Sequence, residues 1–393
     1  NGMRQQMEEE QWDLCRLLDA ALHGRKPDRM PGPEKMQELL KFADRHSLLP
    51  LLYGTIGEDI KAKSRQTVQQ SYHLLFLSRY VVRTLADSGI ASMVLKGCAA
   101  AEYYPVPELR KSGDVDLLLE NEEAVEAAYR CLEAQGFRRA DEQHAHHHLV
   151  CVSPDHIDIE LHMTLTEPFD EQRVNDRLAE WQAEFFRHCC EEEIMGITLP
   201  VPEKPYFAFY LLLHMLQHFL RAGFGLKLLC DWVVFWEHGC RPEEEQTFLR
   251  LVRENGMEGF CGMVTAFCVS YLGLAEKKVS FLTAGGSRRI KHADLEEFLS
   301  EILEAEEFGR SSQERMVALR GSRMSDFLRE FHHQTLLTYP GARRRRVLYP
   351  VYWVRMFFGF LYRNRHLRGV SSSAVLKKAA KRGRLVEKMH IFR

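Results

Sequence analysis

The sequence predicts an α+β protein in which a small mixed β-sheet lies between an N-terminal helical segment and a C-terminal helical domain. Apolar side chains recur at helical spacing up to about residue 85, and again after residue 202. Between these parts, short segments of alternating polarity are typical of strands. We therefore divide the 393 residues into segments 1–85, 86–200 and 201–393, long enough for two or three compact units.

The N-terminal segment is predicted to consist of helices. Trp12, Cys15, Leu18 and Leu22 have helical spacing, and a Pro-Gly-Pro break at 31–33 precedes a second helix. A long helix is expected over residues 68–85, ending before the turn at 87–89.

The middle segment is predicted to supply the sheet. We expect strands at 90–95, 114–119, 148–152 and 157–163, with the last two paired around a turn at 153–156. Short helices are expected over 98–104, where Pro105 and Pro107 end the first, and over 122–135, where Gly136 closes the second. In the C-terminal domain the clearest helices cover 205–220, 226–236, 243–254 and 259–272.

The charge is unevenly distributed. The net charge is −2, but residues 342–393 contain 15 lysines or arginines and a single acid, Glu387. This basic tail could contact a polyanion, such as nucleic acid, or anionic lipid, or the acidic remainder of its own protein, and its aromatic stretch at 349–362 suits base stacking, a core helix or an interfacial helix.

The cysteine pattern and hydropathy indicate the compartment. The ten cysteines have no zinc-finger spacing, which favours free thiols, and we see no signal peptide and no segment suited to stable membrane insertion. We therefore expect a cytoplasmic protein.

The pair Asp114 and Asp116 is the strongest functional signal. The two acids flank Val115 at the start of an apolar strand, and residues two apart on a strand point to the same face. Carboxylates this close repel each other unless a cation lies between them, and Mg²⁺ is commonly held by one or two carboxylates together with substrate phosphates. Phosphoryl or nucleotidyl transfer is therefore the first hypothesis, against a solvated strand edge.

A second polar face lies on the strand at 157–162. Asp158, Glu160 and His162 alternate with apolar residues, so they share one face. The pattern fits a solvated edge strand, or a third carboxylate that completes a metal site with the earlier pair.

The turn at Lys96 and Gly97 joins a strand to the short helix that begins at Cys98. Glycine allows backbone N–H groups to approach a phosphate there, and Lys96 could add a positive charge. Arg110, just before the acidic strand, could bind phosphate or form an ordinary salt bridge.

The order of these parts resembles the uncharacterised nucleotidyltransferase-like family of the polymerase-β-type superfamily. The resemblance extends from about residue 35 to residue 240. The matching positions are Lys96-Gly97, Arg110, Asp114-Val-Asp116-Leu-Leu, Glu160-Leu-His162, His214, His218 and Asp231-Trp232. Two positions depart from the family pattern: Glu160 replaces the commoner aspartate, and Cys98 stands where many relatives have serine.

The resemblance implies a nucleotidyltransferase core that transfers a nucleoside monophosphate from an NTP to an acceptor, with two Mg²⁺ (or Mn²⁺) ions. Asp114 and Asp116 would hold the metals. Glu160 would bind the metal nearer the acceptor and help to deprotonate the attacking hydroxyl, and Asp158 could replace it. The remaining nucleotide-binding positions would be Lys96, Gly97, Cys98, Arg110 and His162.

The sequence leaves alternatives for the histidines, for the acceptor and for the class of protein. The histidine group at 142–148 could bind a transition metal, line the acceptor pocket or form a polar edge, while His214 and His218 are expected to face the catalytic cleft with Asp231 as a partner. The acceptor could be a small molecule, a protein side chain or an RNA end. The competing class is a non-catalytic nucleotide- or nucleic-acid-binding regulatory protein that retains the fold.

Overall fold

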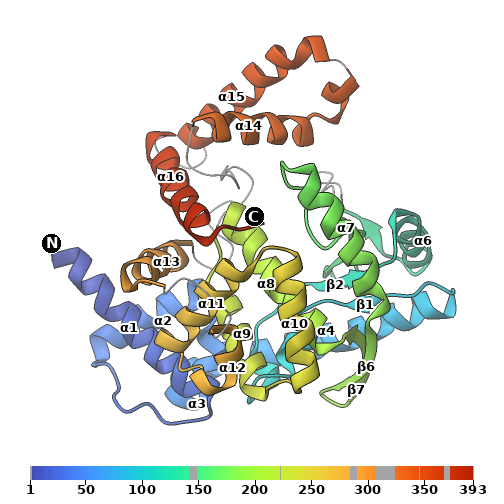
Figure 1. Cartoon of the computed structure of the whole chain (residues 1–393). Helices are drawn as coiled ribbons and strands as arrows, with labels where there is room; N and C mark the ends of the chain where they lie inside the picture. Colours follow the sequence, from blue (N-terminus) through green and yellow to red (C-terminus); the bar gives the residue numbers. More distant parts are fainter. Residues whose placement is uncertain are drawn as a thin grey trace.

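The structure is a computed structural model that describes residues 2–140, 148–221, 223–283, 290–305, 324–344, 346–366 and 372–392. It has a small mixed sheet surrounded by helices, so the predicted α+β class is confirmed (Figure 1). The strands are β1 (Met93–Val94), β2 (Val115–Leu118), β3 (Arg138–Arg139), β4 (His148–Val152), β5 (Asp158–His162), β6 (Cys189–Ile194) and β7 (Ile197–Pro202). The helices are α1 (Gly2–Leu22), α2 (Pro33–Arg45), α3 (Tyr53–Ile56), α4 (Lys61–Asp87), α5 (Cys98–Ala101), α6 (Glu122–Glu133), α7 (Gln172–Arg187), α8 (Lys204–Arg221), α9 (Leu226–His238), α10 (Pro242–Glu254), α11 (Glu258–Tyr271), α12 (Glu276–Thr283), α13 (His292–Ala305), α14 (Met324–Thr338), α15 (Tyr349–His366) and α16 (Ser372–Met389).

The main sheet has five strands in the order β1-β2-β5-β4-β3. β2 and β5 are parallel, with Asp116 directly beside Glu160, and the other neighbouring strands are antiparallel. β2 is buried along its whole length, as its apolar sequence predicts, whereas β5 alternates between buried apolar and more exposed polar side chains at its start. The register therefore places the polar residues of two different strands side by side.

A two-stranded hairpin, β6–β7, is a feature that the sequence analysis did not predict. Its turn contains Met195 and Gly196, both with positive φ (46° and 79°). Positive φ at both central residues is the geometry of the type I′ turn that matches strand twist, although asparagine is the usual first residue. β7 packs against β1 and α4, which extends the layer beyond the main sheet.

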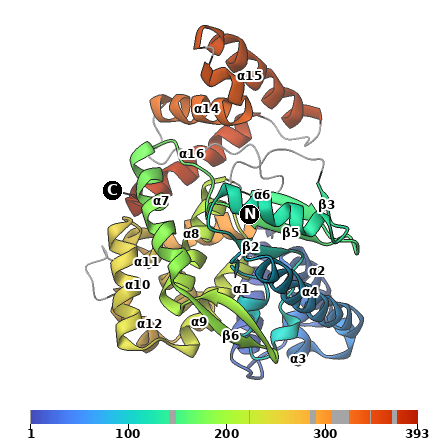
Figure 2. The same ribbon diagram turned by 90° about the vertical axis from the view of Figure 1, so that its right-hand side faces the viewer.

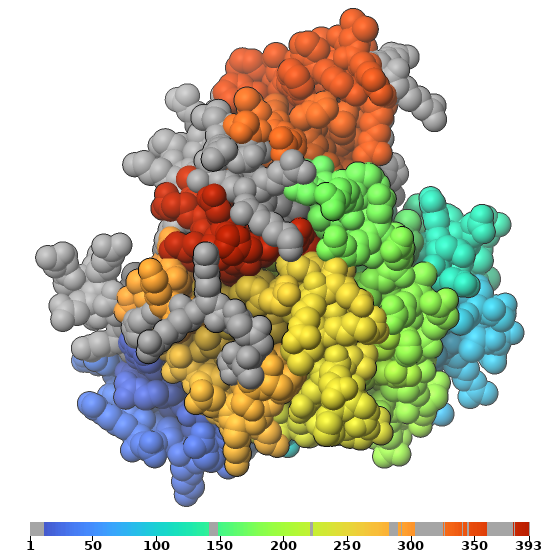
Figure 3. Space-filling view, viewed as in Figure 1, coloured from blue at the N-terminus to red at the C-terminus, as the bar shows by residue number. Residues whose placement is uncertain are grey.

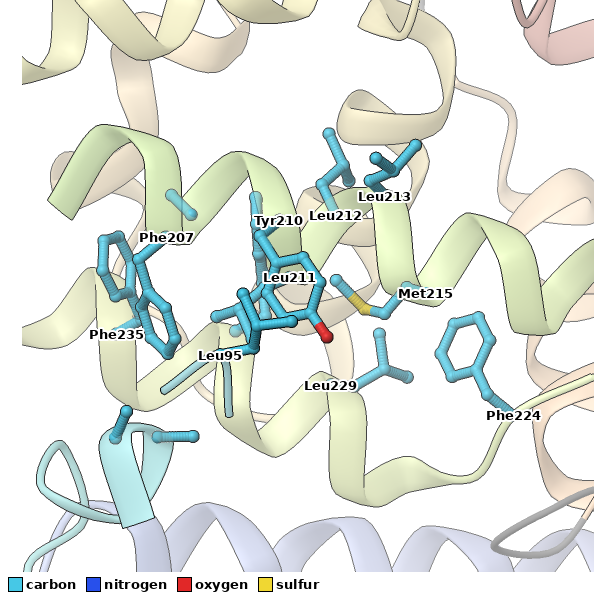
Figure 4. Packing of buried hydrophobic residues seen from close by; sticks show 14 of the residues in the cluster. Leu95, Phe207, Tyr210, Leu211, Leu212, Leu213, Met215, Phe224, Leu229 and Phe235 are labelled. Carbon is cyan, nitrogen blue, oxygen red and sulfur yellow. The ribbon is translucent and has the colours of Figure 1, made fainter. Parts of the chain in front are cut away.

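The helices α8 and α9 form the centre of the hydrophobic core. Both are apolar around most of their circumference, which is typical of buried helices. Figure 4 shows Phe207 of α8 beside Phe235 of α9, with ring centroids 5.9 Å apart, and Leu95 and Tyr210 belong to the same buried cluster. The same buried cluster extends from α1 through the sheet to α16. The strand end that carries Lys96 is therefore fixed against the helical domain.

The C-terminal helices differ in their packing. α16 packs on α11 and α13, and its Arg382 forms a buried ion pair with Glu301 of α13 (2.8 Å), so part of the basic tail neutralises an acid of its own protein. α14 and α15 project from the main body (Figures 1, 2 and 3). Val351 and Phe358 on α15 are each 62% exposed, so these residues of the aromatic stretch do not form a core helix. No described helix combines the length and apolarity that crossing a membrane requires.

Candidate functional site

Three carboxylates converge at the junction of β2 and β5. Asp116 lies beside Glu160 in the parallel register, and Asp114 precedes β2 by one residue, two positions from Asp116. One oxygen from each of these three side chains lies within 4.8 Å of the others. Asp116 is buried (1% exposed), while Asp114 and Glu160 are half-buried. The structure thus brings together the three acids that the sequence analysis selected as metal ligands.

Two cationic side chains contact the buried carboxylate. Nε2 of His162 is 3.0 Å from Oδ1 of Asp116 and 3.2 Å from Oε2 of Glu160, and Nζ of Lys96 is 3.4 Å from the same Asp116 oxygen. Because a buried charge is costly unless it is paired, these contacts explain how Asp116 is accommodated. Its second oxygen, Oδ2, is buried and accepts no hydrogen bond from any residue that the structure describes.

The charges in this cluster shift one another's titration. Burial alone would lower the pKa of His162, but its hydrogen bonds to Asp116 and Glu160 raise it to about 9. The charge of Asp116, followed by burial, raises the pKa of Asp114. Burial opposes ionisation of Glu160, yet the hydrogen bond and charge of His162 lower its pKa. With the three carboxylates ionised, the cluster has three negative groups against the two cations His162 and Lys96.

The turn that carries Lys96 is held close to the acids by the backbone. Leu95 donates its N–H to the carbonyl of Asp116 (3.1 Å), and Gly97 has a φ of +68°, which favours glycine. A Cβ at Gly97 would lie 3.8 Å from the Asp114 carbonyl oxygen, so the requirement for glycine arises from φ and not from lack of space. The thiol of Cys98 points toward Ser78 of α4, and burial raises its pKa to about 11.

A buried ion pair connects this turn to the helical domain. Nε and Nη2 of Arg110 each donate to one carboxylate oxygen of Asp231 on α9, both at 2.7 Å, and Nη1 donates to the carbonyl of Gly97 at 3.2 Å. Tyr104 also donates to Asp231 (2.7 Å). Of the two roles considered for Arg110, the structure contains the salt bridge. Asp231 is accordingly the partner of Arg110 and Tyr104, and no local pattern in the sequence indicates a pairing between residues so far apart.

Two further histidines border the cluster from α8. His214 and His218 have adjacent rings (4.4 Å between centroids) and are half-buried, as the i, i+4 spacing predicts. Burial, together with the charge of Lys96, lowers the pKa of His214 well below its usual range and that of His218 to about 4. Both imidazoles are therefore neutral near pH 7.

The remaining predicted positions lie around this cluster. His148 of β4 stands directly opposite His162, and burial lowers its pKa. Asp158 is exposed and belongs to neither of the groups with metal-ligand spacing among the described residues. The other members of the histidine group, at positions 142–147, lie outside the residues that the structure describes.

The donor set of the cluster fits a divalent cation. Three carboxylates supply the oxygen ligands that Mg²⁺ and Mn²⁺ prefer, and the buried Oδ2 of Asp116 accepts no hydrogen bond within the described part of the chain. The local excess of negative charge would favour the same ion. These residues can therefore bind a cation beside a site where Lys96 provides a positive charge.

Comparison with known proteins identifies the class to which this fold and cluster belong. A family model described as an uncharacterised nucleotidyltransferase matches residues 32–273, which include the sheet, the acidic cluster and α8 to α11. The match covers well over half of the chain, so the chain belongs to this family. Membership indicates a transferase and an NTP substrate.

The comparisons with solved structures and with curated proteins give no further information about the site. A nucleotidyltransferase-like antigenic protein from Paracoccidioides brasiliensis is similar to 53% of this chain and 96% of its own, with 12% identity and a TM-score of 0.32. A similarity this low carries no argument about the site. No curated protein matches the chain.

Proposed function

We propose that the protein transfers a nucleoside monophosphate from an NTP to the hydroxyl of an acceptor, with Mg²⁺ or Mn²⁺ bound by Asp114, Asp116 and Glu160. The observation that carries this proposal is the convergence of the three carboxylates beside Lys96, with one buried Asp116 oxygen that has no hydrogen-bond partner among the described residues. A solvated strand edge would not bury Asp116, and its acids would not meet those of a neighbouring strand.

The carboxylates and the bound cations would have separate roles in the transfer reaction. The acceptor oxygen attacks the α-phosphorus, the bond between the α-phosphorus and the bridging oxygen breaks, and pyrophosphate leaves. Glu160, the most accessible of the acids beside His162, would help to remove the proton of the acceptor hydroxyl. Bound divalent cations would supply charge neutralisation of the phosphates and activation of the hydroxyl.

Lys96 and the Gly97 turn would bind the β- and γ-phosphates. Lys96 contacts Asp116 in the structure, so its ammonium group would interact with both this carboxylate and the phosphates when the nucleotide is bound. The helix that follows the turn, α5, has only four residues, so its dipole contributes little and the lysine charge dominates. Arg110 would act as a positioning residue because its Nη1 holds the carbonyl of Gly97 while its other nitrogens are bound to Asp231.

Asp114→Asn tests the proposed catalytic role. The variant keeps the side-chain shape but removes a metal-binding charge, so transfer of a labelled NMP should fall roughly a thousandfold, equivalent to several kcal/mol of lost transition-state stabilisation. NTP-induced thermal stabilisation that requires Mg²⁺ should fall as well. Asp155→Asn, in the exposed turn between β4 and β5, is the matched control and should leave both readouts unchanged.

A second pair of variants tests whether Glu160 or Asp158 is the third metal-binding carboxylate. Glu160→Gln should reduce transfer as strongly as Asp114→Asn, whereas Asp158→Asn should have little effect because Asp158 is exposed and lies outside the cluster. Mg²⁺-dependent NTP binding that persists in the Asp114→Asn/Asp116→Asn double variant would refute the proposed site. NTP binding without transfer to any acceptor would favour a non-catalytic nucleotide-binding protein.

A further inference from the structure

The geometry points to a second metal-binding ligand set on the same sheet face, formed by His148, Glu160 and His162 and suited to a transition-metal ion such as Zn²⁺. It shares Glu160 with the proposed Mg²⁺ site, but it requires neither a nucleotide nor the transfer reaction. One potential ligand atom from each residue lies within 4.8 Å of the others.

The strand register creates this set. β4 and β5 are antiparallel, and His148 stands directly opposite His162, so both side chains project from the same face. Their ring centroids are 5.1 Å apart. Glu160, two residues before His162 on β5, shares that face by the alternation of the strand. The three groups are therefore held together by backbone pairing and not by a chance approach of surface side chains.

The donor atoms distinguish this set from the neighbouring one. Asp114, Asp116 and Glu160 offer only oxygen, which suits Mg²⁺, whereas two imidazole nitrogens and one carboxylate suit Zn²⁺, Co²⁺ and Mn²⁺. Ligand atoms around a tetrahedral ion with bonds of about 2.1 Å lie roughly 3.4 Å apart, so modest side-chain rotation brings the three atoms into range. Glu160 could then serve both sets, as carboxylates do in centres with two neighbouring ions.

The simplest competing explanation is that the histidines only neutralise the charge of the neighbouring carboxylates. His162 can do this alone because its Nε2 already contacts both Asp116 and Glu160. The observation that favours a metal-binding set is the strand register, which places His148, Glu160 and His162 on one face with their ligand atoms within 4.8 Å. If Nε2 of His162 binds the metal, it exchanges its contact with Asp116 for one with the ion, while Lys96 remains beside Asp116.

Metal titration of the full chain tests this inference without nucleotide. After chelator treatment, the protein should bind Co²⁺ with visible absorption bands typical of nitrogen ligation, and Zn²⁺ should displace the Co²⁺. His148→Ala should weaken Co²⁺ binding at least about tenfold, because loss of one ligand costs more than loss of an outer-shell partner. His73→Ala, an exposed histidine on α4, should not change it.

The outcomes separate this inference from the proposed function. His148→Ala should lose the Co²⁺ bands but keep Mg²⁺-dependent stabilisation by NTP, and Asp114→Asn should do the reverse. A variant that lacks His144, His146 and His147 should retain the Co²⁺ bands. The inference is overturned if that variant loses them while His148→Ala keeps them, or if Co²⁺ binds with an all-oxygen spectrum.

Discussion

The buried pair of Arg110 and Asp231 allows a quantitative prediction about stability. Arg110 is 4% exposed and Asp231 2%, and two hydrogen bonds of 2.7 Å join them. Asp231→Asn removes the counter-charge and leaves the guanidinium buried. Removing one partner of such a pair costs about 3–5 kcal/mol, whereas replacing both with apolar residues is often close to neutral. We therefore expect Asp231→Asn to lower the free energy of unfolding by about 3–5 kcal/mol.

Urea unfolding monitored by tryptophan fluorescence can measure this change, because Trp232 is adjacent to Asp231 and fully buried. The double variant Arg110→Met/Asp231→Leu should be less destabilised than the sum of the two single variants. Arg241→Met removes the exposed ion pair with Glu244 and should lower the urea midpoint far less than Asp231→Asn, because solvent screens that pair. A cost below about 1 kcal/mol for Asp231→Asn, or full additivity in the double variant, would refute the reasoning.

Two further predictions concern the turn and the neighbouring helix. Gly97 has φ +68° and ψ −112°, a combination that L residues rarely adopt, so Gly97→Ala should destabilise the protein by about 1–3 kcal/mol. The variant should also weaken NTP binding, which calorimetry can measure, and equal NTP affinity would argue against a phosphate role for the turn. Burial lowers the pKa of His218 from 6.5 to about 4, so the unfolded chain binds more protons in this range. Stability from the neutral imidazole is present above about pH 6.5 and is lost as the pH falls toward 4. In His218→Gln, the urea midpoint should therefore change less with pH between about pH 6.5 and pH 4. An unchanged dependence of the midpoint on pH would contradict the lowered pKa of His218.

Local periodicity explains which parts of the fold the sequence could predict. The alternation at 157–162 and 148–152 predicted β5 and β4 closely, since a half-buried strand imposes a period of two. The hairpin β6–β7 lacked this signal: its turn uses Met195 in place of asparagine, and Glu191, Glu192 and Glu193 interrupt the alternation.

The candidate site was predictable only where its geometry is local. The two-residue spacing of Asp114 and Asp116 shows that they share a face, and the resemblance to a family added Glu160. The partner of Arg110 could not be predicted, because Asp231 is 121 residues away and its position depends on how α9 packs. Likewise, the pairing of His148 with His162 depends on the register between two strands.

The parallel pairing of β2 with β5 has a consequence for the order in which the protein is completed. Asp116 and His162 are 46 residues apart, and the intervening α6, β3 and β4 must be synthesised before they can meet. Contacts between distant parts of a chain form slowly because closing the loop costs entropy. A nascent chain that ends before β5 therefore lacks His162, one of the two cations that contact Asp116. Because β5 is the central strand and pairs with both β2 and β4, its addition joins the two halves of the sheet and completes the acidic cluster in the same step.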